Sequence, residues 1–301
     1  MNTNLRTIAC VALMCGLASA VWGQDKGLRI YISADMEGVV GVVTGEQLGP
    51  EGFEYERFRE FMTAEVNAAI EAARAAGATE FLVSDSHGNG QNLLLERLPD
   101  DVMVVRSWPR SLSMMAGIDE SFDAVIFLGY HASTANMHGV RAHTMSSAYI
   151  TGLRLNGIEM TEGSINAAIA GQFGVPVIMV SGDDVAVAEN QRLIGDIEGA
   201  VVKYAKGFHS AQTVTPNAAY EIIRSHTKAA LDRIDDFKPY VLKTPIELQL
   251  SLKHYQPVEL LGYLPNVTRI DSHTIRFAGK DMTEISDFLT FVEEYRIDLQ
   301  P

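Results

Sequence analysis

The sequence predicts an α/β protein built on a doubly wound, mostly parallel sheet, with a smaller C-terminal α+β domain. Up to about Thr213, strand-like apolar runs alternate with segments of helical periodicity, an order that places helices on both faces of a parallel sheet. In residues 123–129, Asp123 is followed by a continuous apolar run, as is typical of a strand buried on both faces. Beyond Thr213 the alternation gives way to half-exposed strands and a final helix, which indicates the second domain.

Local signals divide the first domain into elements. Strands are expected where β-branched and aromatic residues cluster, and helices where apolar residues recur every three or four positions. Asn156-Gly157 between two strand-like runs predicts a hairpin. The expected strands are residues 28–33, 80–84, 102–105, 123–129, 148–155, 158–160 and 175–181, and the expected helices are residues 56–76, 162–173 and 183–193.

The later part of the chain opens with a helix from Thr215-Pro216 to about Ile234. Pro216 falls in its first turn, where the missing N–H costs nothing. Residues 246–251 alternate apolar and polar side chains, as a half-exposed strand does. Short strands near Thr268 and Thr274 and a helix over 282–295 are expected after it.

The N-terminus has the features of an export signal. Residues 8–17 are an apolar run after Arg6, too short to remain as a membrane anchor. Small residues favour cleavage after Ala20 or Gly23; an uncleaved amphipathic helix is the alternative, but the run has no polar face. We therefore expect a periplasmic or secreted protein. The expected division is a signal peptide at 1–23, an α/β metal-binding catalytic domain at 24–212 and a smaller α+β domain at 213–301.

Composition restricts the chemistry and the partners. Both cysteines, Cys10 and Cys15, lie in the leader, so a metal would have to be held by His, Asp or Glu side chains. The formal net charge is −14, which argues against nucleic acid and anionic membrane as partners. After leader cleavage, no further segment is apolar for long enough to cross a membrane.

Polar clusters follow three of the predicted strands. Residues 33–38 contain Asp35 and Glu37, residues 84–88 contain His87, and residues 129–131 end in His131. In open α/β sheets the carboxyl ends of the strands border the ligand crevice, so these side chains should converge. Carboxylates and imidazoles together suit one or two borderline divalent ions.

Spacing supports this interpretation. Asp35 and Glu37 are two residues apart, so in an extended segment both side chains point the same way, and Gly38 would let the chain turn behind them. A carboxylate can bridge two cations, as in dinuclear peptidases and phosphatases. Each histidine ligand needs an acceptor for its second nitrogen, and Asp85 is a candidate.

Each residue also has an ordinary structural interpretation. A lone Asp35 after a strand is more often a helix cap or turn former than a ligand. A lone His87 is more often a hydrogen-bonded polar group. The joint occurrence at three strand ends is what favours a metal site.

Several motifs resemble those of a known family. Ser33-Ala-Asp-Met-Glu-Gly38, Asp85-Ser-His87, Gly129-Tyr-His131, Ala142-His-Thr144 and Glu162 followed by Asn166-Ala-Ala168 are similar in order and spacing to the DppA-like (M55) D-aminopeptidases. The resemblance runs from about Leu28 through the final helix.

The resemblance implies a two-domain metallopeptidase with two zinc ions, assembled as a homo-oligomer, a decameric ring. It implies Asp35, Glu37, His87, His131 and Glu162 as metal ligands, with Asp35 as the bridge. It also implies His143 as the catalytic histidine. His138, five residues earlier, is the competing candidate.

The predicted function is zinc-dependent hydrolysis of short peptides at their N-terminus, and the resemblance implies that the N-terminal residue is a D-amino acid, of the D-Ala type. Two alternatives use the same residues: a dinuclear phosphoesterase or deacylase, and an exported metal- or peptide-binding protein without catalytic activity. The absence of a Gly-rich phosphate loop after the first strand counts against the phosphoesterase.

Overall fold

The computed structural model describes residues 27–295, so the predicted leader at 1–23 lies outside the described residues. Its larger sheet has seven strands in the order β3-β2-β1-β4-β7-β8-β9, parallel except for the β8–β9 pair. The strands are β1 (Leu28–Ala34), β2 (Ala78–Asp85), β3 (Met103–Val105), β4 (Ala124–Tyr130), β7 (Val177–Asp183), β8 (Glu198–Gly207) and β9 (Ser210–Thr213).

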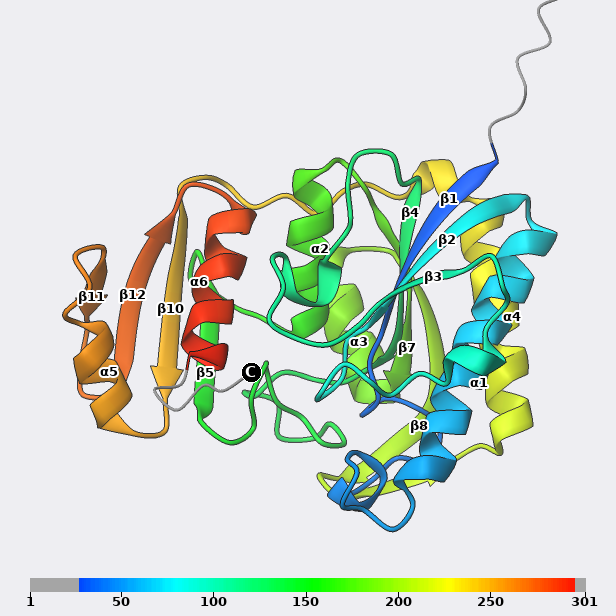
Figure 1. Ribbon diagram of the computed structural model, residues 1–301, viewed down its shortest axis with the longest axis horizontal. Helices are drawn as coiled ribbons and strands as arrows, with labels where there is room; N and C mark the ends of the chain where they lie inside the picture. Colours follow the sequence, from blue (N-terminus) through cyan, green and yellow to red (C-terminus); the bar gives the residue numbers. More distant parts are fainter. Residues whose placement is uncertain (1–26, 296–301) are drawn as a thin grey trace, which may run out of the picture.

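Helices cover both faces of this sheet, as the sequence predicts. One face carries α1 (Tyr55–Ala75) and α4 (Pro216–Asp232), and the other carries α2 (Glu162–Gln172) and α3 (Asp184–Ile194) (Figure 1). Every residue of β4 and β7 is buried, which confirms that the apolar run within 123–129 is a central strand.

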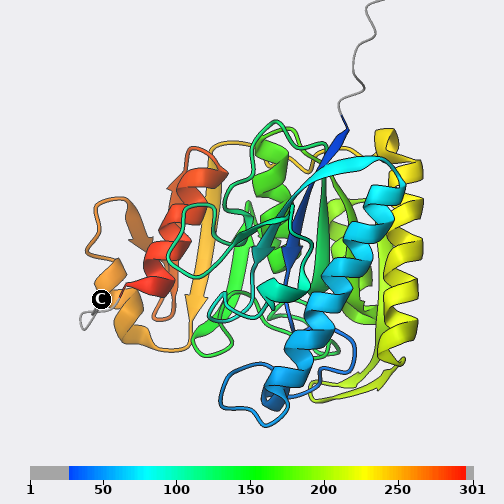
Figure 2. The same cartoon turned by 45° about the vertical axis from the view of Figure 1, so that its right-hand side comes forward.

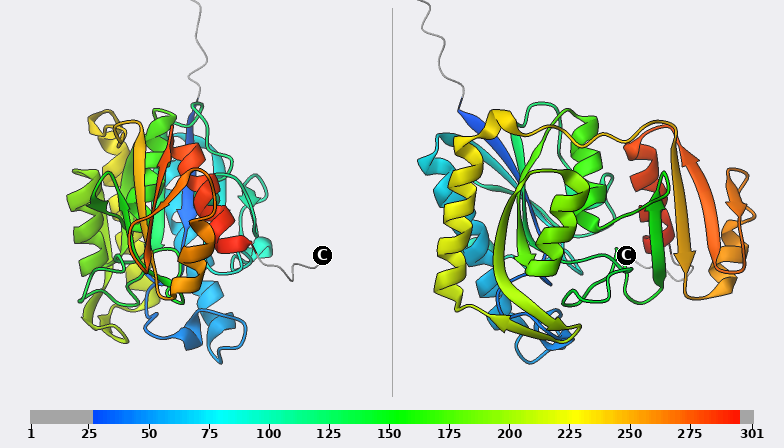
Figure 3. Two further views of the ribbon diagram at one scale, coloured as in Figure 1. Left: turned by 90° about the vertical axis from the view of Figure 1, so that its left-hand side faces the viewer. Right: turned by 180° about the vertical axis from the view of Figure 1, so that it is seen from behind.

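The smaller sheet stands beside the α2 side of the large domain and has the order β11-β12-β10-β5-β6 (Figures 1 and 2). All its strand pairs are antiparallel. Its elements are β5 (Ile150–Leu155), β6 (Ile158–Glu159), β10 (Ile246–Leu252), α5 (Tyr255–Leu261), β11 (Val267–Arg269), β12 (Thr274–Gly279) and α6 (Met282–Glu294). Helix α6 lies between this sheet and the large domain (Figure 3).

The hairpin turn forms where it is predicted. Asn156 and Gly157 both have positive φ, 51° and 79°, as a two-residue type I′ turn requires. The hairpin, however, joins the smaller sheet, since Leu153 and Leu155 pair with Leu250 and Leu248 of β10.

The smaller sheet is thus not built from residues after 213 alone. Strands β5 and β6 come from the middle of the chain, while α4, which follows residue 213, packs against α1 of the large domain. A single cut at 212/213 does not follow the sheets, because apolar periodicity specifies a strand but not the sheet it joins. Among the described residues, no helix is long and apolar enough to cross a membrane.

Candidate metal centre

The carboxyl edge of the large sheet brings the predicted ligands together. Asp35 follows β1, His87 lies two residues beyond β2, and His131 directly follows β4. Strand β1 pairs with both β2 and β4, so these segments leave neighbouring strands. The strand order reverses between β1 and β4, the topological switch point where open α/β sheets bind ligands.

Two further candidates reach the same place from other elements. Glu162 is the first residue of α2, and a capping box fixes this helix start: Thr161 Oγ1 accepts from Ser164 N at 2.9 Å, and Ser164 Oγ accepts from Thr161 N. His143 lies in the segment between β4 and β5. Its ring stacks on that of His131, with centroids 4.0 Å apart and planes at 9°.

The contacts form two groups that share one carboxylate. His87 Nδ1 lies 2.8 Å from Glu37 Oε2 and 3.2 Å from Asp35 Oδ1. His131 Nε2 lies 3.2 Å from Glu162 Oε1 and 3.3 Å from Asp35 Oδ2. Asp35 therefore presents one oxygen to each group, which is the arrangement of a carboxylate that bridges two cations.

Orphaned atoms show that the cluster fits a metal. Among residues 27–295, Asp35 Oδ2, Glu37 Oε2 and His131 Nε2 are buried without a hydrogen-bond partner. Buried polar atoms of this kind are costly unless something binds them. Ligand atoms of Asp35, Glu37 and His131, and separately those of His131, His143 and Glu162, lie within 4.8 Å of one another. Carboxylate oxygens and imidazole nitrogens at this spacing are a donor set for zinc-like ions.

Backbone carbonyls hold the opposite ring nitrogens. His87 Nε2 donates to Leu48 O at 2.8 Å, and His131 Nδ1 donates to Ala132 O at 3.0 Å. These bonds leave Nδ1 of His87 and Nε2 of His131 as acceptors aimed into the cluster. The carbonyls thus select the tautomers that a metal needs.

The sequence interpretation of Asp85 is wrong. Its carboxylate accepts from Asn92 N at 2.6 Å and from Leu93 N at 2.7 Å. Asp85 therefore stabilises the loop after β2 and does not hold a histidine. A side chain two residues from a ligand is close enough to suggest the role, but its direction depends on the path of the loop.

The role expected of Gly38 also changes. Residues 35–37 bend instead of continuing as an extended segment, and φ of Gly38 is not in the left-handed region. The constraint is space: Gly38 N donates to Gly129 O at 2.6 Å, and a Cβ on Gly38 would lie 2.1 Å from Tyr130 O. Glycine allows the ligand loop to approach the end of β4.

The local electrostatics favour a cation in the cluster. Burial, together with the charge of Glu37, raises the pKa of Asp35. Burial alone would lower the pKa of His87, but the carboxylates of Glu37 and Asp35 raise it well above its usual value. For His131, burial likewise lowers the pKa, but the adjacent carboxylate of Glu162 raises it, and the net result is a pKa well above the usual value. The carboxylates that stabilise protonated imidazoles would equally stabilise a divalent ion.

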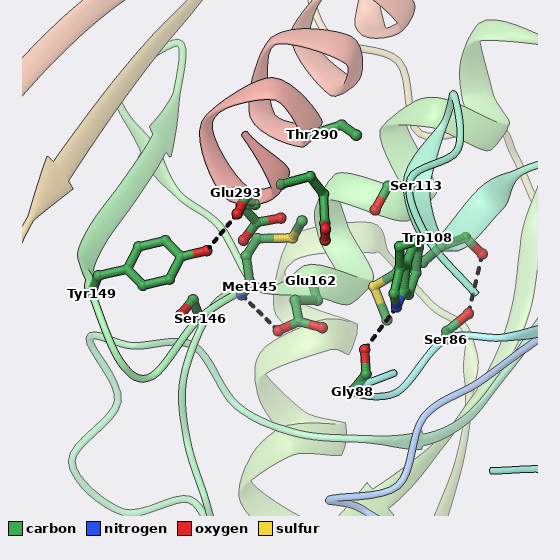
Figure 4. A pocket seen from close by; sticks show the side chains of 12 residues that line it. Ser86, Gly88, Trp108, Ser113, Met145, Ser146, Tyr149, Glu162, Thr290 and Glu293 are labelled. Carbon is green, nitrogen blue, oxygen red and sulfur yellow. Dashed lines mark hydrogen bonds between the residues drawn. The ribbon is translucent and has the colours of Figure 1, made fainter. Parts of the chain in front are cut away.

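Two adjoining cavities give access to the cluster. One, of about 210 Å³, is lined by ligand residues and His143, and the other, of about 180 Å³, extends toward α6. Figure 4 shows the second cavity, with Glu162 near Met145; Glu293 of α6 also lines it. The residues that line both cavities are Ser86, Gly88, Met145, Ser146 and Glu162. A ligand that extended from the cluster into the second cavity would thus contact both domains.

Of the two competing histidines, only His143 reaches the cluster. His143 Nε2 lies 3.6 Å from Glu162 Oε1, whereas His138 is exposed in the preceding loop, where its backbone N–H donates to Asn136 Oδ1.

Two buried charged residues near the site have no role in the sequence analysis. Glu65 and Lys203 are fully buried, and both hydrogen-bond to the ligand loop, residues 37–42, which follows Asp35. Lys203 was missed because no strand was predicted at β8.

Fold and site together define an α/β metallohydrolase. The sequence profile of the Peptidase_M55 family, described as D-aminopeptidase, matches residues 28–291. A D-aminopeptidase of Bacillus subtilis (strain 168) is 33% identical over 261 residues, which cover 85% of this chain and 93% of that protein. The chain therefore belongs to the M55 family of D-aminopeptidases, and it is a metallo-aminopeptidase.

A solved structure agrees with this assignment. It is described as "Zn-dependent D-aminopeptidase DppA from Bacillus subtilis, a self-compartmentalizing protease". It matches this chain with a TM-score of 0.86 at 30% sequence identity, covering 91% of this chain and 100% of that chain.

Proposed function

We propose that this protein is an exported, zinc-dependent aminopeptidase that removes N-terminal D-amino acids, of the D-Ala type, from short peptides. The observation that carries the proposal is Asp35, whose two oxygens face two separate histidine–carboxylate groups. A shared carboxylate of this kind is a feature of dinuclear peptidases. Family membership supplies the reaction and the preference for D-residues.

The residues present fit two zinc ions per chain. Glu37 and His87 with Oδ1 of Asp35 would hold one ion, and His131 and Glu162 with Oδ2 of Asp35 would hold the other. When bound, zinc supplies a Lewis acid that polarises the scissile carbonyl and lowers the pKa of a water molecule. The zinc dependence of the related DppA from Bacillus subtilis supports this choice of metal.

His143 is the proposed catalytic residue. Its Nδ1 donates to Arg141 O at 2.8 Å, which fixes the ring and leaves Nε2 as the nitrogen that can gain or lose a proton. The side chain lines the cavity and is 14% exposed, more than His87 or His131. A proton held at this Nε2 can be passed to the leaving amine, the task of a general acid.

The cavities suit a small cationic substrate. Their walls carry carboxylates from the cluster and from Glu293 and Glu294 of α6, which attract the ammonium group of a peptide N-terminus. Volumes of about 210 and 180 Å³ admit a short peptide and not a folded chain. These features favour short peptides over proteins as substrates.

Export and assembly complete the proposal. The leader at 1–23 supports a periplasmic or secreted location, where D-alanine-containing peptides from cell-wall turnover would be available. The related DppA is a self-compartmentalizing protease. That property of a relative supports a homo-oligomer here, with a decamer as the expected size.

The direct test compares stereoisomers. The purified chain, loaded with zinc, is given D-Ala-D-Ala and L-Ala-L-Ala at equal concentrations, and free alanine is measured. Faster release from the D,D peptide supports the proposal, and faster cleavage of the L,L peptide would end the claim of D-preference. Elemental analysis should give two zinc ions per chain, and fewer than two in Asp35→Ala.

The same preparation separates the alternative reactions. A panel of nitrophenyl phosphates beside aminoacyl nitroanilides distinguishes a phosphoesterase from an aminopeptidase. We expect turnover only of the nitroanilides. Turnover of the phosphates alone would replace the peptidase assignment.

A further inference from the structure

A fully buried lysine lies beneath the loop that carries Glu37. Lys203 projects from β8, and its Nζ lies 2.5 Å from Glu37 O, 3.0 Å from Val39 O and 2.8 Å from Val42 O. An ammonium group has three N–H donors, so each donor is matched to one carbonyl. All three acceptors belong to residues 37–42, the segment between β1 and α1.

The loop depends on such contacts because it pairs with no strand ladder. Its buried carbonyls need donors, and Lys203 supplies three of them from one point. On the amide side, Val40 N donates to Glu65 Oε1 at 2.9 Å, and Gly38 N donates to Gly129 O. Side chains of α1 and β8 therefore shape this loop from behind.

Burial of this lysine needs an explanation beyond packing. Taking an ammonium group out of water costs several kcal/mol even after relaxation, and an apolar side chain of similar length would fill the space at lower cost. The nearby carboxylates of Asp183 and Glu65 partly compensate the charge. An apolar side chain could not donate to the three loop carbonyls, and this is the function that the lysine serves here.

The metal ligands differ in how they are held. Asp35 has its own backbone anchor, since Asp35 N donates to Leu128 O at 2.8 Å. His131 directly follows β4 and Glu162 starts α2, and both lie outside the loop. Glu37 has its carbonyl on Lys203 and its carboxylate 2.8 Å from His87 Nδ1.

We propose that Lys203 is a positioning residue that sets the affinity of one of the two metal ions, the ion held by Glu37 and His87, by fixing the loop that carries Glu37. The proposal rests on the proposed dinuclear zinc site. Without the three donors the loop can relax and withdraw the Glu37 carboxylate, while Asp35, His131 and Glu162 keep their places. Loss of Lys203 should therefore weaken the binding of the ion held by Glu37 and His87 and leave the affinity of the other ion unchanged.

The test measures zinc binding directly. Apo protein is titrated with Zn²⁺ in competition with a chromophoric chelator, which gives a separate affinity for each ion. Lys203→Met keeps an unbranched side chain, one atom shorter, and loses the donors. This variant should bind one ion about 10–100-fold more weakly, the usual effect of losing an outer partner of a ligand. The second ion should bind with the wild-type affinity.

Val202→Ala is the matched control. Val202 is the preceding residue of β8 and is also fully buried, but its apolar side chain has no donor for the loop carbonyls. It should lower stability through lost packing without changing either zinc affinity. Urea unfolding of both variants separates loss of stability from loss of the ion.

Two further variants keep the test decisive. Lys203→Gln retains an amide donor and should weaken the same ion by less than Lys203→Met does. If the methionine variant fails to fold, weaker binding of that one ion in Lys203→Gln tests the proposal by itself. In a Glu37→Gln background, Lys203→Met should have no further effect on the weakened ion, because the two substitutions act on one ligand.

The outcomes are distinct. If the wild type binds no zinc, the proposed function fails. If the wild type binds two ions and Lys203→Met or Lys203→Gln binds both with unchanged affinity, or weakens both equally, the positioning role is overturned while the metallopeptidase assignment stands.

Discussion

Asp35, Glu37, His87 and His131 are ionisable side chains that each expose less than a tenth of their surface. Isolated charges would be expensive in such surroundings. Opposite charges within about 3 Å compensate them: the imidazoles and carboxylates contact one another directly. The charges of the cluster therefore stabilise one another, and removal of one side chain leaves the buried charges of its partners without compensation.

At this scale, His143→Ala separates catalysis from metal binding. We expect kcat to fall by about 10²–10⁴-fold, as for the loss of a general acid–base group, with two zinc ions retained by elemental analysis. His138→Ala is the matched control, because His138 lies exposed outside the cluster, and it should leave kcat unchanged. Loss of a zinc ion from His143→Ala would show instead that His143 is a ligand.

Glu65 predicts a pH dependence of stability. Burial raises the pKa of its carboxyl group to about 7, against 4.5 in the ordinary state. Between these pH values the folded chain binds a proton that the unfolded chain has released, so the contribution of Glu65 to stability falls as pH rises through this window.

Glu65→Gln should remove this dependence. The amide keeps the shape and an acceptor for Val40 N, but it carries no charge. The difference in unfolding free energy, variant minus wild type, should therefore be larger at pH 7.5 than at pH 4.5, by on the order of 2 kcal/mol. Urea unfolding of both apo proteins at the two pH values checks this, and a constant difference between them would contradict the assigned pKa.

At the scale of elements, the site depends on how segment ends meet. The capping box fixes the start of α2 and with it Glu162, while the bend after β1 packs on the end of β4. Most elements were predicted within a few residues, but β8, β9 and α5 were missed. Their sequences lack a continuous apolar run, because β8 mixes charged and apolar residues and β9 is polar.

A pair of glycine substitutions tests this packing. Gly38→Ala places a methyl group against the carbonyl of Tyr130, so we expect a loss of at least about 2 kcal/mol in unfolding free energy and weaker zinc binding. Gly157 has φ of 79° and no atom within 4 Å of its added Cβ. Gly157→Ala should therefore cost about 1–2 kcal/mol through backbone strain alone.

Zinc titration distinguishes the two variants. Gly157→Ala should bind zinc as the wild type does, since its added methyl group would meet no other atom within 4 Å. Equal zinc affinities in Gly38→Ala and the wild type would mean that the contact with β4 does not position the ligands.

At the scale of the whole molecule, the second domain supplies one wall of the cavity beside the cluster through α6 (Figure 4). A largely apolar groove of about 650 Å³ lies between α5 and the end of α6, and Leu260 of α5 and Tyr263 beyond it are 59% and 76% exposed. Large exposed apolar surfaces of this kind commonly mark interfaces between chains.

If copies of this chain meet at that groove, Leu260→Glu should break the proposed oligomer. We expect light scattering to give a smaller mass for Leu260→Glu than for the wild type, since a buried unpaired carboxylate opposes association. Met103→Glu is the control, with an exposed apolar residue replaced on edge strand β3 of the other sheet. An unchanged mass for Leu260→Glu would rule out this face.

Sequence alone determined the doubly wound class and the convergence of Asp35, His87 and His131. Both follow from local patterns combined with a general rule of topology, because neighbouring parallel strands end at the same edge of a sheet. The Asn156-Gly157 turn was equally local, since two positive φ angles restrict the residue types. The resemblance to a family added Glu162 and His143.

Only the tertiary structure decided that the hairpin at 150–159 joins the smaller sheet, that Leu48 O and not Asp85 holds His87, and that Gly38 is needed for space. It also revealed Lys203 beneath the ligand loop. Each of these depends on which distant segment packs against a residue. Periodicity encodes which face of an element is apolar, but partner, direction and close approach are set by contacts between segments far apart in the chain.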